Sequence, residues 1–390
     1  MNIFQNKMLL LAPIVTLVVV FIFAITQIPS AKQAPKNVPI AIVNEDEGIE
    51  LPQKGKMNFG EIIVENIEKS TKAIKAGDEP AIKWISVSSL KEVKEGMNDQ
   101  KYYGAIVIPE DFSTNQASIQ TPKPLSPEMQ MYVNQGMNAM ASNTVTQMLN
   151  AIVDTMNQKS SSELLEGFKK QGKMITTEQA SILASPIKKS IINVNQTGKQ
   201  GNAPVSLFQP LWMASIVGAV IIWNAMKKLQ RPTRKKKLGD KLVQVLIAAI
   251  TALFTGFVLT WFANSMLGFE IPQIIDTALF LSLTNFSFIL MISAILAWLG
   301  MAGVPIFVLL LFFGAPLLAM APEFMPTFYQ EWIFTWLPMR FMIDGLRELF
   351  FFSQELSWNQ PTSVLVWIGL GSLVVFFLSI FKSDNPKGIS

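Results

Sequence analysis

Six long apolar stretches constrain the fold of this chain more than any other feature. An α-helix rises 1.5 Å per residue, so about 20 apolar residues cross a hydrocarbon core about 30 Å thick. The stretches predict transmembrane helices at residues 8–28, 207–226, 242–266, 274–298, 302–320 and 362–381. We therefore expect a polytopic α-helical membrane protein with six transmembrane helices.

Two of these spans depend on a further argument. Residues 8–28 could instead be a cleavable signal peptide, but the run is about twice as long as a typical apolar signal region, so we expect a retained span. Residues 274–320 form a single apolar run that is too long for one span. Gly300, Gly303 and Pro305 are expected to break it into two helices.

A basic segment at residues 227–241 sets the expected orientation. It carries eight Lys and Arg side chains within fifteen residues. Cytoplasmic loops are enriched in these residues, and this bias orients membrane proteins. With the segment in the cytoplasm, residues 29–206 and 321–361 lie outside and both termini lie inside. The same segment is suited to binding anionic lipid headgroups of the membrane.

Composition excludes several classes of function. Residues 29–206 hold 19 basic and 19 acidic side chains, so the net charge of +4 comes from the membrane-associated remainder. A nucleic-acid partner is not expected, because it would require a basic face on a soluble domain. Cysteine and histidine are both absent, which excludes Cys/His zinc sites, thiol redox chemistry and triads with a histidine base. We identify no catalytic, cofactor-binding or metal-binding residues.

Residues 29–206 have the pattern of an extracytoplasmic α/β domain. Apolar runs predict strands, and helical periodicity between them predicts a sheet covered by helices. The expected strands are residues 38–43, 82–87, 102–108 and 129–133, and the expected helices are residues 59–74, 89–97 and 137–156.

Two smaller features of this domain also lead to predictions. A further helix should begin at Thr176, with Gln179 completing a capping box, and be interrupted at Pro186. The acidic turn at residues 44–48 lacks the spacing of an EF-hand loop, so we expect it to be solvated rather than a cation site.

Three short segments, in this order along the chain, carry a resemblance to a known family. They are VPIAIVNEDEG at residues 38–48, GAIVIPEDFS at residues 104–113, and Leu337-Pro338-Met339-Arg340 with Gly345-Leu346-Arg347. Together with one span, a large outer domain and five further spans, they resemble ABC-2 type transporter permeases. Within that family the chain is most similar to the branch that includes the bacterial phage infection proteins.

The resemblance implies partners and a location. It implies a homo- or heterodimer of permease subunits in a bacterial cell membrane, each docked on a cytoplasmic ATP-binding subunit. The chain has no G-x-x-x-x-G-K-[ST] loop, so ATP and its hydrolysis would belong to that separate subunit, and no enzyme activity or cofactor is expected here.

The expected function is export of an amphiphilic or lipid-linked substrate. The alternative is a cell-surface receptor or secretion-assembly protein without transport activity, in which the spans only anchor the outer domain. A membrane enzyme is a weaker interpretation, because no plausible catalytic site is found.

Three groups of residues are candidates for roles in such a transporter. By resemblance, the basic segment includes the loop that couples to the ATPase: Lys227, Lys228, Arg231, Arg234, Lys235, Lys236, Lys237 and Leu238. Residues 321–361 are too long and too apolar for a plain loop. Within them, Arg340, Asp344 and Arg347 share one helical face and can pair, which charged groups near a bilayer require.

The second group, in residues 321–361, and the third group, two asparagines within the spans, have competing interpretations. Residues 321–361 either form an amphipathic helix in the outer interface or, as the resemblance implies, short re-entrant helices that close a transport path. Asn264 and Asn285 lie within spans and are candidates for contacting substrate. For Asn285 we favour a hydrogen bond to a neighbouring helix.

Overall fold

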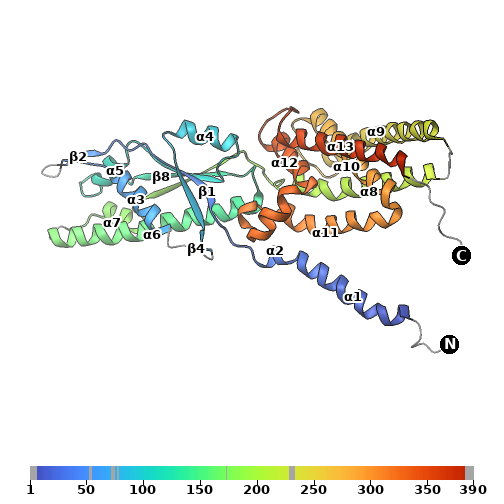
Figure 1. Ribbon diagram of the computed structural model, residues 1–390. Helices are drawn as coiled ribbons and strands as arrows, with labels where there is room; N and C mark the ends of the chain where they lie inside the picture. The colour runs from blue at the N-terminus through green and yellow to red at the C-terminus, as the bar shows by residue number, and fades with distance from the viewer. Residues whose placement is uncertain are drawn as a thin grey trace. The chain divides into compact units, whose positions relative to one another are not determined.

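The computed structural model in Figure 1 describes residues 7–51, 55–71, 75–76, 79–172, 174–227 and 233–382. The chain divides into two compact units. The first, which we call the helical unit, comprises Met1–Gln33, Asn202–Met320 and Met325–Ser390. The second, the sheet unit, comprises Ala34–Gly201 and Ala321–Phe324.

The helical unit contains the helices that suit a membrane. Among the described residues, four helical stretches are long and apolar enough to cross one: Ala203–Lys227 (α8), Arg234–Ser265 (α9), Ile274–Ala319, and Gln360–Phe381, which is α13 (Gln360–Leu378) with a terminal 3-10 turn. In addition, α1 (Lys7–Thr26) and α2 (Ile28–Ala31) cover the first predicted span. This length and composition indicate a membrane protein.

The stretch Ile274–Ala319 is interrupted where the glycines predict a break. α10 (Ile274–Leu299) ends at Gly300, whose φ of +63° favours glycine. A 3-10 turn (Gly300–Gly303) follows, and α11 (Val304–Ala319) then turns back beside α8 (Figure 1). The indole Nε1 of Trp212 on α8 donates to the carbonyl of Phe307 on α11 at 3.0 Å, which fixes this packing.

The sheet unit is built on a five-stranded sheet of order β6-β1-β7-β8-β9. β1 is parallel to both β6 and β7, β7 is antiparallel to β8, and β8 is parallel to β9. The strands are β1 (Val38–Asn44), β6 (Ile82–Ser86), β7 (Gly104–Ile108), β8 (Glu128–Asn134) and β9 (Lys188–Val194). Two small hairpins, β2 (Ile49–Leu51) with β3 (Gly55–Met57) and β4 (Lys75–Ala76) with β5 (Glu79–Pro80), lie outside this sheet.

Helices cover both faces of the sheet, as the alternating pattern predicts. Every second residue of β1 points to the same face, so Ile40 and Ile42 pack toward α3 (Phe59–Thr71) and α6 (Ala139–Gln171). Ala41 and Val43 face the opposite way and pack with Val93 and Met97 of α4 (Leu90–Asn98). Figure 1 shows these layers, and α5 (Phe112–Ser118) and α7 (Thr177–Ala184) complete the unit.

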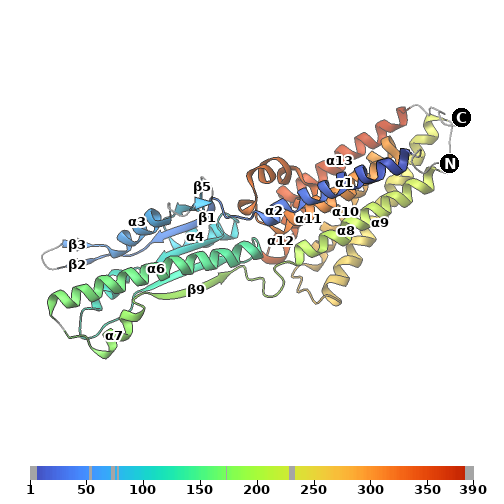
Figure 2. The ribbon, with the colours of Figure 1, turned by 90° about the horizontal axis from the view of Figure 1, so that it is seen from below.

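Two elements of the sheet unit differ from the predictions. α6 continues well beyond residue 156 and ends at Gly172, whose φ of +63° forms a left-handed C-cap. After Pro186 the chain forms the strand β9 rather than more helix, and β9 lies parallel to β8 and beside α6 (Figure 2). The capping box of Thr176 and Gln179 at the start of α7 is confirmed.

The short segment Ala321–Phe324 belongs to the sheet unit although it follows α11 in the chain. Ala321 and Phe324 are buried in the hydrophobic core that contains β1 and β7. The carboxylate of Glu323 accepts a hydrogen bond from the Tyr103 hydroxyl at 2.8 Å, and its carbonyl accepts one from the Lys36 N–H at 2.8 Å. The sheet unit is therefore assembled from two separate parts of the chain.

Candidate functional site

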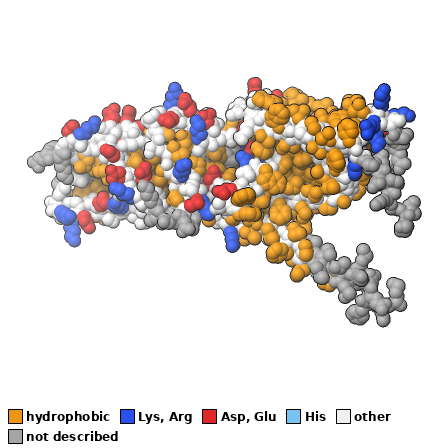
Figure 3. Space-filling model, viewed as in Figure 1, with side chains coloured by type: hydrophobic (Ala, Val, Ile, Leu, Met, Phe, Trp, Pro, Cys, Tyr) orange, Lys and Arg blue, Asp and Glu red, His pale blue; other side chains and the backbone are white. Residues whose placement is uncertain are grey.

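The basic segment joins two of the long helices. α8 ends at Lys227 and α9 begins at Arg234, while Lys228 and Arg231 lie outside the described residues. Lys235, Lys236 and Lys237 continue the first turn of α9, and Leu238 follows with 45 % of its surface exposed. Figure 3 shows Lys and Arg side chains gathered at this end of the helical unit, next to a broad hydrophobic face.

Aromatic rings lie near the cations at this end, from the same helix for Lys227 and from another part of the chain for Arg234. Lys227 lies 4.9 Å from the centre of the Trp223 ring, and Arg234 lies 5.7 Å from that of Phe381. Each contact places a cation near an aromatic ring, which attracts it. Because Phe381 follows α13, the start of α9 and the end of α13 lie together.

A second pair of contacts extends this arrangement. Lys241 on α9 lies 3.6 Å from the centre of the Phe376 ring on α13. Lys382 Nζ donates to the carbonyl of Trp298, near the end of α10, at 2.6 Å. The ends of α8, α10 and α13 and the start of α9 thus share one end of the helical unit.

The charges at the start of α9 oppose the helix dipole. Arg234 to Lys237 occupy the first turn, which contains no acidic residue. The N-terminus of a helix carries partial positive charge, so each cation there costs about 0.3–1 kcal/mol when exposed. An anionic lipid surface or an acidic protein surface would offset this cost, so the segment is electrostatically suited to such a partner.

Arg340, Asp344 and Arg347 lie together on α12 (Pro338–Phe351) and pair as predicted. Asp344 accepts from Arg340 Nε at 3.3 Å and from Arg347 Nη1 at 3.4 Å. The side chains of Arg340, Asp344 and Arg347 are 26 %, 29 % and 11 % exposed, respectively, so the pairing compensates charges that are largely removed from solvent. The Arg340 guanidinium also lies 4.9 Å from the centre of the Phe334 ring.

α12 packs against α8, α10 and α13 rather than standing alone. Its buried face includes Met342 and Leu346, and a Cβ on Gly345 would collide with the ring of Phe280 on α10. Short 3-10 and π-helical turns precede it. In these turns, the Tyr329 hydroxyl donates to the Ile25 carbonyl at 3.0 Å, and burial raises the pKa of Tyr329.

Asn285 and Asn264 do not form a common site. Asn285 is buried in the middle of α10, and its Oδ1 accepts from the Ser215 hydroxyl on α8 at 3.3 Å, which confirms the predicted bond between helices. Its Nδ2 is buried and has no hydrogen-bond partner in the described part of the chain. Asn264 is half-buried in the last turn of α9, whereas Asn285 lies about 16 Å of helix rise after Ile274, where α10 begins.

The carboxylate of Asp46 accepts several hydrogen bonds that the sequence pattern does not reveal. Asp46, at the end of β1, is only 7 % exposed, so the expectation of a solvated turn is wrong for this residue. Asp46 accepts from the N–H of Gly60 at 3.0 Å and from the N–H of Ser113 at 2.9 Å, and also from the Ser113 hydroxyl. Gly60 and Ser113 belong to the first turns of α3 and α5, whose N–H groups lack partners within their helices.

Glu45 likewise accepts a hydrogen bond from the first turn of a third helix. Its Oε1 accepts from the N–H of Leu90, the first residue of α4, at 2.8 Å. The acidic turn after β1 therefore organises the starts of α3, α4 and α5, and it joins the two segments VPIAIVNEDEG and GAIVIPEDFS. Within the described ranges, no group of three acidic side chains is arranged to hold a metal ion.

Comparison with known proteins gives one family and one weak structural likeness. The model of a family described as "Protein of unknown function (DUF3533)" matches residues 7–373. Among solved structures, a domain of a putative ABC type-2 transporter from Thermotoga maritima is 18 % identical, with 40 % of this chain and 84 % of that chain covered and a TM-score of 0.27. No curated protein sequence matches the chain. Since the family model spans most of the chain, the protein belongs to the DUF3533 family.

Proposed function

We propose that this chain is the permease subunit of an ABC-2 type exporter of the phage infection protein branch. It would move an amphiphilic or lipid-linked substrate outward, driven by ATP hydrolysis in a separate cytoplasmic subunit. The observation that carries the proposal is the position of the three segments with family resemblance. Two of them form the adjacent strands β1 and β7, joined through Asp46 and Ser113, and the third forms α12.

In this proposal the six spans are α1, α8, α9, α10, α11 and α13. The basic segment and both termini face the cytoplasm of a bacterial cell, and the sheet unit faces outward. The shared end of α8, α9, α10 and α13 supports this arrangement, because consecutive spans must return the chain to the same side of the membrane. The excess of Lys and Arg at that end supports a cytoplasmic location for it.

The charge of the basic segment supports the coupling role that the family resemblance implies. Arg234 to Lys237 oppose the dipole of α9, and an acidic surface on the ATPase or anionic lipid would offset that cost. A second permease subunit would complete the transport path. The paired Arg340, Asp344 and Arg347 on α12 would then help to close its outer end.

The chain contains no cysteine, so a single introduced cysteine can be labelled specifically to test for the ATPase partner. Leu238→Cys, labelled with a photoactivatable crosslinker in cells, is expected to capture a protein that contains a nucleotide-binding loop. The matched control is Leu125→Cys, because Leu125 is also an exposed leucine but lies in the sheet unit, and it should capture no ATPase.

Two results would overturn the proposal. One is that Leu238→Cys and Leu125→Cys capture the ATPase equally, or that neither variant captures it. The other is robust ATP hydrolysis by the purified chain alone. If only the sheet unit proved necessary for function while the spans tolerated replacement by another anchor, the receptor alternative would be favoured.

A further inference from the structure

A cavity of about 470 Å³ lies in the sheet unit between α3 and α6. Its size falls within the range of small-molecule sites, which are mostly apolar with a few placed polar groups. The apolar lining includes Phe59, Ile63, Ile82, Met148, Ile152 and Met156. Of these, Ile82 and Ile152 are buried and form part of the hydrophobic core, so the cavity opens from the core toward the surface.

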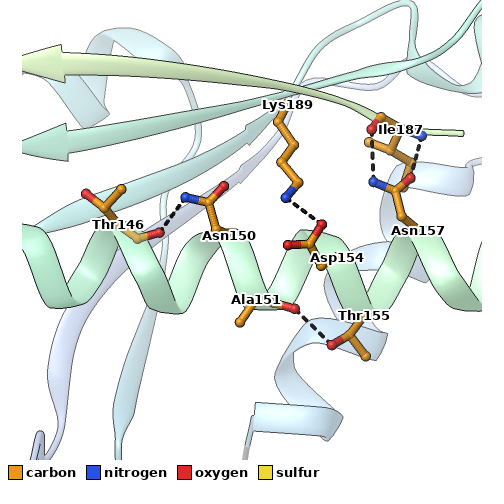
Figure 4. Close-up of polar contacts among 8 residues, drawn as sticks. All are labelled: Thr146, Asn150, Ala151, Asp154, Thr155, Asn157, Ile187 and Lys189. Carbon is orange, nitrogen blue, oxygen red and sulfur yellow. Dashed lines mark hydrogen bonds and ion pairs between the residues drawn. The ribbon is translucent and has the colours of Figure 1, made fainter. Parts of the chain in front are cut away.

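Most hydroxyl groups that line the cavity already have partners. Thr71 Oγ1 donates to the Ile67 carbonyl at 2.7 Å and accepts from Trp84 Nε1 at 2.7 Å. Thr155 Oγ1 donates to the Ala151 carbonyl at 2.8 Å (Figure 4). These groups bond within the protein, so they offer little to a ligand and leave the wall largely apolar.

The side-chain amide of Gln116 on α5 differs from these paired hydroxyl groups. Gln116 lines the cavity, and its side-chain Oε1 is buried and has no hydrogen-bond partner within the described residues. A buried acceptor without a donor is costly, so native proteins almost always pair such atoms. A ligand with a hydroxyl or amide N–H would supply the missing donor.

The cavity is held open by contacts on the opposite side of α6. In Figure 4, Asp154 and Asn157 point toward β9, whereas Ala151 and Thr155 lie on the other side of the helix. Asn157 bonds to both the N–H and the carbonyl of Ile187, at 2.7 and 3.0 Å, and Asp154 pairs with Lys189. α6 is thus fixed to the sheet edge and cannot collapse onto α3 without breaking these bonds.

Polar residues mark the mouth of the cavity. Lys159 Nζ on α6 donates to Asn66 Oδ1 on α3 at 3.2 Å, which bridges the two helices at the surface. Glu163 lies one turn farther along α6 and is exposed. An apolar interior with a polar rim matches a molecule that has an aliphatic body and a polar end.

We propose that this cavity binds the aliphatic part of an amphiphile whose hydroxyl or amide group donates a hydrogen bond to Gln116 Oε1. The inference goes beyond the proposed function, since binding here requires neither ATP nor a partner subunit. Failure of the binding test would leave the export proposal standing, and failure of the ATPase capture would leave this site standing.

Photolabelling of the full-length protein in lipid nanodiscs tests the site. The probe is dodecan-1-ol with a diazirine within its chain, and a diazirine-bearing dodecane without the hydroxyl is its partner. Mass spectrometry should find adducts of the alcohol on peptides of α3 and α6, and excess unlabelled dodecan-1-ol should reduce them. Absence of adducts on both helices would overturn the proposal.

Two variants sharpen the test. Ala151→Trp should fill part of the cavity and reduce labelling at least fivefold, whereas Glu166→Trp, exposed on the same helix away from the cavity, should stay within twofold of wild type. Gln116→Leu should reduce labelling by the alcohol roughly three- to tenfold, as expected for loss of one hydrogen bond, and leave labelling by the alkane unchanged.

The outcomes separate the alternatives. Wild-type labelling of Ala151→Trp would show that the adducts arise elsewhere, and an equal loss of both probes in Gln116→Leu would show that no hydrogen bond selects the ligand. Thermal unfolding of each variant is measured in parallel. If Ala151→Trp proved unstable, the ratio of alcohol to alkane labelling in Gln116→Leu would decide the question alone.

Discussion

Asp46 and Ser113 are bonded twice: the carboxylate of Asp46 accepts from the backbone N–H of Ser113 at 2.9 Å and also from its hydroxyl. The pair joins the end of β1 to the start of α5, and a third bond, from the Gly60 N–H, adds the start of α3. Removing this carboxylate would leave several buried N–H groups unpaired, so its effect on stability can be predicted.

Asp46→Ala is expected to destabilise the sheet unit by about 2–4 kcal/mol, because hydrogen bonds to a charged group and the cost of orphaned donors add together. Pulse proteolysis of the purified full-length protein in urea measures the loss. Glu47→Ala is the matched control, since Glu47 is the exposed neighbour in the same acidic turn. Similar urea midpoints for the two variants would show that the Asp46 bonds are not important for stability.

The proposed orientation predicts opposite accessibility for two engineered cysteines. Leu125→Cys in the sheet unit should react with a membrane-impermeant maleimide in intact cells without a wall. Leu238→Cys in the basic segment should react only after the membrane is permeabilised. Both leucines are exposed, at 60 % and 45 %, so accessibility of the side chain itself does not differ greatly. The reverse pattern would place the sheet unit in the cytoplasm and remove the basis for the export proposal.

Gly256 is expected to tolerate no side chain. A Cβ at Gly256 on α9 would lie 2.6 Å from the Ala278 carbonyl oxygen on α10, so the two backbones would have to separate. Gly256→Ala should cost about 1–3 kcal/mol, which is typical of overpacking. Gly218→Ala on α8 is the control, because its Cβ would meet atoms no nearer than 3.7 Å. After heating, the fraction of protein that remains monodisperse in size-exclusion chromatography is compared between Gly256→Ala and Gly218→Ala. Equal losses of monodisperse protein in the two variants would refute close packing of α9 on α10.

Asp344→Ala should destabilise the helical unit by about 1–3 kcal/mol, since it leaves two partly buried arginines without their shared carboxylate. Glu95→Ala is the control, because Glu95 Oε1 forms a solvent-exposed ion pair with Lys91 Nζ at 3.8 Å. Its loss should change the free energy of unfolding by less than about 1 kcal/mol. Thermal unfolding midpoints of both variants provide the comparison. A change in Asp344→Ala no larger than that in Glu95→Ala would mean that the pairing on α12 contributes little.

The strands that are most easily predicted from the sequence are those with buried, strongly apolar residues. β1 and β7 are buried along nearly their whole length, so their apolar runs are easily recognised. β9 lies at the sheet edge with alternating exposed and half-buried positions, and it begins with two lysines, so no comparable run marks it. Its strand conformation depends on pairing with β8, which a local pattern does not contain.

Local spacing also explains which polar contacts could be predicted. Arg340, Asp344 and Arg347 pair within one helix, so their separation in sequence is sufficient. Asp46 reaches Ser113 over 67 positions of sequence, and nothing in the acidic turn itself reveals that partner. At the start of α4 the Ser89 hydroxyl accepts from the Glu92 N–H at 3.3 Å, whereas the Glu92 carboxylate bonds to Ser88, which lowers the pKa of Glu92.

The insertion of Ala321–Phe324 into the sheet unit means that the polypeptide passes between the two units four times, not twice. Two of these passages flank a stretch of only four residues, anchored by Phe324 in the core and by Glu323 on Tyr103. Truncation of the chain at the end of α11 would therefore remove Ala321 and Phe324 from the hydrophobic core of the sheet unit. Completion of that core depends on a segment that is synthesised more than a hundred residues after β9.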